Sequence, residues 1–103
     1  MLRLRLQAVR MSRLHASSAA IVSANVASMA NPILMAERSD PVDEADSGWQ
    51  FWGGENDPVS VEDAQIWSVG EVLQLEPTLT AYIDLPTGTK LERASRNASW
   101  SKS

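Results

Sequence analysis

The pattern of apolar and polar positions predicts several short elements rather than a few long ones. Residues 19–26 are apolar enough to form a first strand, and residues 33–38 form a second, with a turn signal at Asn31-Pro32 between them. A hairpin between these two strands is expected. Residues 89–93 alternate like a final strand, which would turn the side chain of Leu91 inward.

The most informative stretch is 46–55, which holds three of the six aromatic residues and three of the five glycines. Gly48 can adopt a positive φ, so residues 46–48 predict a turn. The next four residues, Trp-Gln-Phe-Trp, predict a short aromatic strand. Because side chains alternate along a strand, Trp49 and Phe51 should share the core face, and Trp52 should be the more exposed ring.

The segment after residue 64 predicts a short stretch that is either strand-like or extended, followed by two short helices. Residues 65–67 are short and apolar. Ser68 and Glu71 have the spacing of a capping box that starts a helix ending near Leu75. Pro77 suits the first position of a second helix. The predicted fold class is therefore α+β, with a small antiparallel sheet packed by one or two short helices.

The length of 103 residues favours a single domain. We expect a basic extension at 1–18, an α+β domain at 19–93 and a frayed polar tail at 94–103. The extension has the composition of a transit peptide, of the charged region of a secretory signal, or of an unstructured segment with Met11 as the true start. We favour the unstructured segment.

Charge is divided unevenly along the chain. Residues 1–36 carry four arginines and no acid, whereas residues 37–92 carry all thirteen acids with only Arg38 and Lys90 as bases. Such a body should repel nucleic acid and attract basic proteins or cations, although an acidic surface also serves solubility alone. The uncharged run 16–36 is rich in Ser and Asn, so no membrane span is expected and a cytoplasmic location is favoured.

Composition excludes several chemistries. The chain has no cysteine and one histidine, which rules out disulfides, thiolate zinc sites and multi-histidine metal sites. No phosphate-binding glycine motif is present. We expect no cofactor and no enzymatic activity.

An acidic loop is the main candidate for chemistry. Asp40, Asp43, Glu44 and Asp46 could bind a hard cation or act as an acid–base pair, but their spacing does not match the EF-hand pattern. A solvated charged loop is the favoured interpretation. Tryptophan is common at binding hot spots, so Trp52 is a candidate interface anchor.

From Ile21 to Arg93 the chain resembles a bacterial family of immunity proteins of polymorphic toxin systems, the thirty-third numbered immunity family, formerly catalogued as a domain of unknown function. Three motifs carry the resemblance: Asp46-Ser47-Gly48-Trp49-Gln50-Phe51-Trp52-Gly53, then Tyr82-Ile83-Asp84, and Pro86-Thr87-Gly88-Thr89-Lys90-Leu91-Glu92-Arg93. Glu76-Pro77 stands for the family's Asp-Pro, and Leu91 stands for an aromatic residue. The family's immunity role was proposed from gene neighbourhood.

The resemblance implies a non-enzymatic protein that binds and neutralises a cognate toxin, with a basic nuclease as one toxin class that suits an acidic surface. The alternatives are a metal-binding or hydrolytic accessory domain that uses residues 40–46, or a housekeeping domain. The expected partner contacts are Asp40, Asp43, Glu44, Asp46, Trp52, Glu55 and Asp57. The expected structural residues are Gly48, Trp49, Phe51, Gly53, Tyr82, Pro86, Gly88, Glu92 and Arg93.

Overall fold

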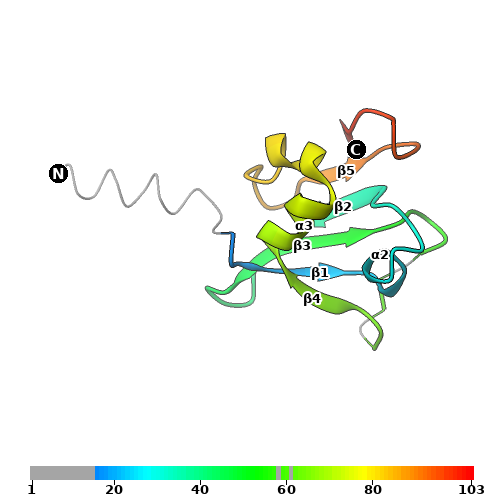
Figure 1. The fold of residues 1–103 in the computed structure, drawn as a ribbon. Coiled ribbons are helices and arrows are strands. Elements are labelled where there is room, and N and C mark those ends of the chain that lie inside the picture. Colours follow the sequence, from blue (N-terminus) through cyan, green and yellow to red (C-terminus); the bar gives the residue numbers. More distant parts are fainter. Residues whose placement is uncertain (1–15, 58, 61) are drawn as a thin grey trace.

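Six strands form one sheet in the computed structural model, which describes residues 16–57, 59–60 and 62–103 (Figure 1). The strands are β1 (Ala19–Val22), β2 (Met35–Arg38), β3 (Asp46–Trp52), β4 (Gln65–Ser68), β5 (Lys90–Glu92) and β6 (Ser101–Lys102). The helical elements are α2 (Ala24–Ala27), α3 (Val69–Leu75) and the 3-10 helix η1 (Pro77–Ala81). The spatial order is β4-β1-β3-β2-β5-β6, and β1 and β3 are parallel while the other paired strands are antiparallel. The predicted α+β class is confirmed.

The long aromatic strand β3 lies at the centre of the sheet. Trp49 and Phe51 are buried on one face and their rings stack with centroids 5.6 Å apart, as the alternation predicts. The predicted turn at 46–48 is wrong in position, because these residues already belong to β3. Gly48 does have a positive φ of 83°, and a Cβ there would lie 2.0 Å from the carbonyl oxygen of Ser39. This close approach explains the glycine.

The predicted hairpin between the first two strands is wrong. β3 inserts between β1 and β2 and pairs with both, parallel to β1 and antiparallel to β2. The first strand also ends earlier than predicted, at Val22. The hydroxyl of Ser23 accepts a hydrogen bond from the N–H of Val26 and caps the short helix α2, which turns the chain away from the sheet.

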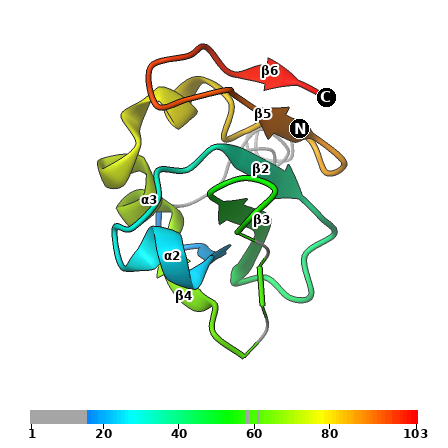
Figure 2. The same ribbon diagram turned by 90° about the vertical axis from the view of Figure 1, so that its right-hand side faces the viewer.

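Helices cover one face of the sheet. Figure 2 shows α3 and η1 stacked on the same side of the strands. Val72 and Leu79 from these helices pack in one core cluster with Phe51 and Leu91. The predicted capping box is present, since the hydroxyl of Ser68 accepts from the Glu71 N–H and the Glu71 carboxylate accepts from the Ser68 N–H. The expected helix at Pro77 is the 3-10 helix η1.

The two ends of the described chain join the sheet. A frayed tail was predicted from residue 94, which is wrong for its last residues: β6 pairs with β5, and Trp100 is only 7% exposed. At the other end, the carbonyl of Ser18 accepts from the Val69 N–H, so residues before β1 already contact the body. The rest of the predicted extension, residues 1–15, lies outside the described residues.

Candidate functional site

The acidic loop between β2 and β3 is shaped by two of its own carboxylates. Asp43 Oδ1 accepts hydrogen bonds from the N–H groups of Ala45 (2.9 Å) and Asp46 (3.1 Å). The Asp46 carboxylate accepts from the N–H groups of Val42 and Gly48, both at 2.9 Å. These are the local side-chain-to-backbone bonds that hold turns together. Asp43 and Asp46 therefore define the conformation of the loop.

Asp40 and Glu44 project from the same loop and are exposed. Within the described residues, no group of three or more carboxylate or histidine side chains is arranged to hold a metal ion. Oδ1 of Asp43 and both carboxylate oxygens of Asp46 accept hydrogen bonds from backbone N–H groups.

The predicted contact residues do not form one patch. β3 has seven residues, so its two ends lie about 20 Å apart at ~3.3 Å per residue. The acidic loop lies at the start of β3, whereas half-buried Trp52 and exposed Glu55 lie at its other end. The structure thus separates the predicted contacts into a loop surface and a Trp52 surface.

Asp57 belongs to neither surface, because it is only 4% exposed. Its Oδ2 accepts from the Ser23 hydroxyl (2.6 Å) and from the Gly53 N–H (2.8 Å), and its Oδ1 accepts from the Asn25 side-chain amide (2.9 Å). The carboxylate ties the turn after β3 to the start of α2. We therefore leave Asp57 out of any partner surface.

Most of the motif residues sit at turns and packing contacts. Half-buried Tyr82 packs against the core cluster and caps η1. Pro86 lies in the turn before β5, where its carbonyl accepts from the Thr89 N–H. In the same turn Gly88 has a φ of 95° and donates to the carbonyl of Arg38 (2.6 Å). A Cβ on Gly53 would lie 2.7 Å from the Cβ of Asn31, so this position also requires glycine.

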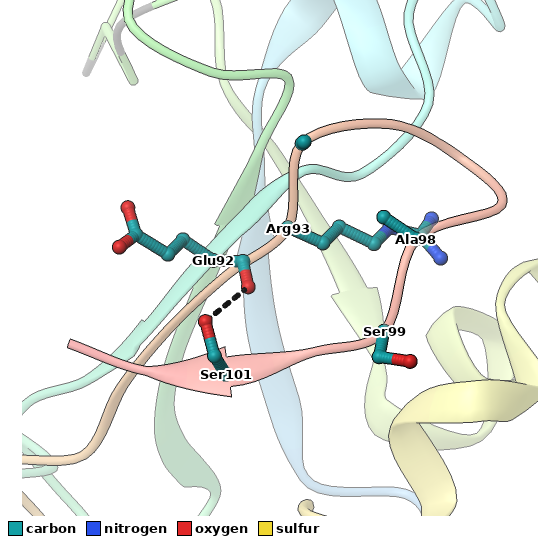
Figure 3. Close-up of a pocket in the computed structure, with 6 residues that line it drawn as sticks. Glu92, Arg93, Ala98, Ser99 and Ser101 are labelled. Carbon is teal, nitrogen blue, oxygen red and sulfur yellow. Dashed lines mark hydrogen bonds between the residues drawn. The ribbon is translucent and has the colours of Figure 1, made fainter.

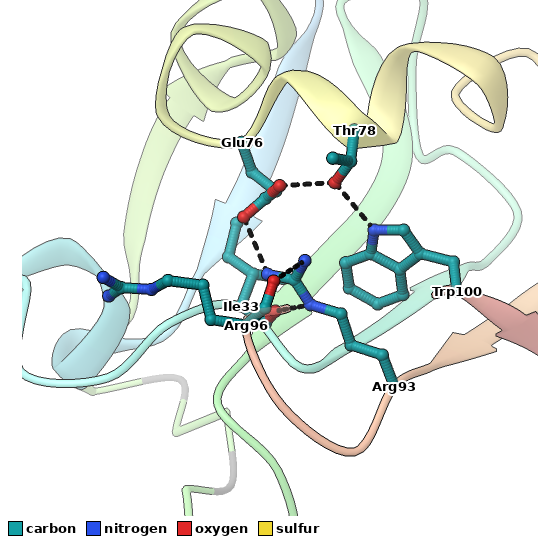
Figure 4. Close-up of polar contacts among 6 residues, drawn as sticks. All are labelled: Ile33, Glu76, Thr78, Arg93, Arg96 and Trp100. Atoms are coloured by element: carbon teal, nitrogen blue, oxygen red, sulfur yellow. Dashed lines mark hydrogen bonds and ion pairs between the residues drawn. The ribbon is translucent and has the colours of Figure 1, made fainter. Parts of the chain in front are cut away.

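A buried arginine joins the C-terminal segment to η1 (Figure 4). Arg93 donates to the carbonyls of Ile33 (3.0 Å) and Arg96 (2.9 Å) and forms an ion pair with Glu76 at 2.7 Å. Its guanidinium lies 4.5 Å from the centre of the Trp100 ring. Sequence reasoning missed Trp100, because a single tryptophan in a polar segment has no periodicity to mark it as buried.

Glu76 and Thr78 complete this network. Thr78 donates from its hydroxyl to Glu76 and accepts from the Trp100 indole N–H at 2.9 Å. Burial raises the pKa of Glu76, but hydrogen bonds from Thr78 and Arg93 and the charge of Arg93 outweigh it, so the pKa of Glu76 is lower than usual. Arg93 and Glu76 thus connect the start of η1 to the segment after β5.

A shallow open depression of about 420 Å³ lies between β5 and the C-terminal segment (Figure 3). Ser101 donates from its hydroxyl to the carbonyl of Glu92 at 3.3 Å across it. Arg93 lines the depression but its guanidinium is committed to the network above. Exposed Glu92 is the only carboxylate among the described residues that line the depression. Among these residues, no side-chain hydrogen bond joins a nucleophile to a base.

The structure is that of a small α+β protein with an exposed acidic loop between β2 and β3. Residues 20–103 match the family model of the Immunity protein Imm33 domain. Because the match covers most of the chain, the chain belongs to the Imm33 family of immunity proteins, as the sequence resemblance predicts. Comparison with curated proteins and with solved structures gave no match. Within the described ranges, no helix has the length and hydropathy needed to cross a membrane.

Proposed function

We propose that this immunity protein neutralises a cognate protein toxin by binding it non-enzymatically in the cytoplasm, with the acidic loop as the main contact. Membership of the Imm33 family supports the toxin partner. We choose the acidic loop as the contact surface because two of its carboxylates are accessible to a partner. Asp40 and Glu44 are exposed and form no ion pair with another described residue.

An exposed loop of this kind favours a basic partner. Unpaired surface carboxylates attract positive charge at a distance and raise the association rate, while they repel nucleic acid. A nuclease, whose own substrate is anionic, is the toxin class that this charge suits best. The carboxylates of the loop would then occupy the basic surface that the nuclease uses for its substrate.

Trp52 and Glu55 form a second contact region in this proposal. At about 20 Å from the loop they lie beyond the Debye length of ~8 Å at physiological salt, so their contribution is largely independent of the loop charges. A half-buried tryptophan supplies apolar contact area with little loss of side-chain freedom. Substitutions in the two regions should therefore have additive effects.

The test uses the toxin encoded beside the gene, coexpressed with the chain and also titrated against it by calorimetry. Glu44→Lys should weaken binding at least about tenfold and reduce the association rate most at low salt. Glu92→Lys is the matched control, because it makes the same charge reversal at an exposed glutamate on β5. Failure of the unmodified chain to bind the toxin or protect cells would refute the proposal. Equal losses in the two variants would exclude the loop as the main contact.

A further inference from the structure

Strand β4 forms one edge of the sheet in the described part of the chain. The N–H of Val69 donates to the carbonyl of Ser18 at 2.8 Å, which fixes the hydrogen-bonded pairs of the β1–β4 ladder at alternate positions. Trp67 and Gln65 therefore turn their N–H and C=O groups toward β1. Ile66 and Ser68 turn theirs to the outer edge.

The first turn of helix α3 engages the backbone N–H of one of these two outward-facing residues, Ser68. The N–H of Ser68 donates to Glu71 Oε1 at 2.9 Å in the capping box. Ile66 is left with its N–H and C=O facing outward, and its side chain is 76% exposed. Ile21 of β1 is the residue paired with Ile66 of β4. It is half-buried and lies on the same face of the sheet, so this edge presents two adjacent apolar side chains.

Acidic residues flank this edge on both sides. Glu62 and Asp63 precede β4, and Glu71 follows it in the first turn of α3; all three are exposed. A second copy of the chain is a poor partner here, since antiparallel pairing about Ile66 would bring the acids before one strand beside the acid after the other. Like charges placed opposite each other across a strand pair are destabilising.

We propose that β4 is a docking edge for an extended segment of the toxin in which an apolar residue lies between basic residues. The segment would add as an antiparallel strand, exchange two hydrogen bonds with Ile66, and place its apolar side chain against Ile66, which itself lies beside Ile21 of β1. Its lysines or arginines would lie beside Glu62, Asp63 and Glu71. This inference deepens the proposed function and rests on it for the identity of the partner.

The first experiment needs no toxin. The synthetic peptide acetyl-Lys-Lys-Thr-Val-Thr-Lys-Lys-amide is titrated to millimolar concentration into the ¹⁵N-labelled full chain, with Glu in place of every Lys in the matched control peptide. Saturable amide shifts centred on Ile66 and Ile21 with the basic peptide alone are expected. Methylation of the central valine nitrogen removes a hydrogen bond and should weaken binding. No saturation, shifts centred elsewhere, or equal responses to both peptides would overturn the inference.

Two exposed apolar positions provide matched variants. Ile66→Lys should weaken peptide binding about tenfold, through loss of one apolar contact and repulsion of the lysines. Met29→Lys makes the same change at a side chain 64% exposed at the end of α2 and should have no effect. Equal affinity of Ile66→Lys and the unmodified chain would refute the docking edge.

Toxin affinity measured for the same variants distinguishes a failure of this inference from a failure of the proposed function. Loss of toxin affinity in both Glu44→Lys and Ile66→Lys, with Met29→Lys unaffected, supports both. If Glu44→Lys loses affinity and Ile66→Lys does not, the docking edge is wrong and the loop proposal stands. If the unmodified chain fails to bind the toxin, the proposed function is wrong and with it the toxin as occupant of β4, whatever the peptide result.

Discussion

Replacing Asp57 with alanine deletes a buried acceptor that receives three hydrogen bonds. Two of its donors, the Ser23 hydroxyl and the Gly53 N–H, lie at the packed junction of α2 and the turn after β3, where Ser23 is 0% exposed. The third donor is the side chain of Asn25, which is exposed and can bond to water instead. The variant thus leaves two donors without a partner.

The magnitude follows from those two donors. An unsatisfied polar group costs about 1–3 kcal/mol, and the buried Ser23 hydroxyl lies toward the upper end of this range while the half-buried Gly53 N–H lies toward the lower end. Asp57→Ala should therefore lower the free energy of unfolding by about 4 kcal/mol. Asp57→Asn should cost only about 1–2 kcal/mol, because its amide oxygen can accept from both the Ser23 hydroxyl and the Gly53 N–H, and the Asn25 amide can turn to offer its own oxygen. Asp63→Ala removes an exposed carboxylate that makes no side-chain hydrogen bond to another described residue, and its cost should stay within about 0.5 kcal/mol.

Urea unfolding followed by the fluorescence of the four tryptophans measures these differences. With a slope of about 1.5 kcal/mol per molar urea, Asp57→Ala should shift the midpoint down by about 2.7 M. An Asp57→Ala variant as stable as Asp63→Ala would show that the carboxylate does not hold the junction. The same reasoning would fail if Asp57→Asn were as unstable as Asp57→Ala.

Three further predictions concern glycine geometry, capping and the C-terminal network. Gly48→Ala should lower the free energy of unfolding by more than about 3 kcal/mol, because its Cβ would overlap the Ser39 carbonyl. Gly88→Ala has open space around the new Cβ and should lower it by only about 1 kcal/mol, because of the positive φ. Equal losses of stability in urea unfolding would contradict this. The hydrogen bonds from the Ser68 backbone and hydroxyl hold the pKa of Glu71 below its usual value, so this stabilisation is present at neutral pH and is lost as pH falls through the lowered pKa. Ser68→Ala keeps the backbone bond and loses the hydroxyl bond, so an NMR titration should show a partial rise in the Glu71 pKa, and an unchanged value would exclude a contribution from the hydroxyl. Trp100→Ala should cost about 3–5 kcal/mol through lost burial, and Trp100→Phe about 1 kcal/mol through the lost bond to Thr78. Calorimetric unfolding in which Trp100→Ala is as stable as the unmodified chain would refute the role of this network.

The features that the sequence predicted correctly depend on residues a few positions apart. The burial of Trp49 and Phe51 on one face follows from the two-residue period of a strand. The capping box of Ser68 and Glu71 follows from a three-residue spacing, and the positive φ of Gly48 from the absence of a Cβ. In each case the physical interaction is contained in one short segment, so a single sequence carries enough information.

Tertiary structure alone decided which distant segments meet. The insertion of β3 between β1 and β2 replaced the expected hairpin, and it placed the acidic loop and Trp52 at opposite ends of the central strand. Asp57 looked like one more surface acid, but its partners Ser23 and Asn25 lie 34 and 32 positions away. Strand order and burial of a charge depend on the free energy of the whole packed arrangement, which local pattern and composition do not encode.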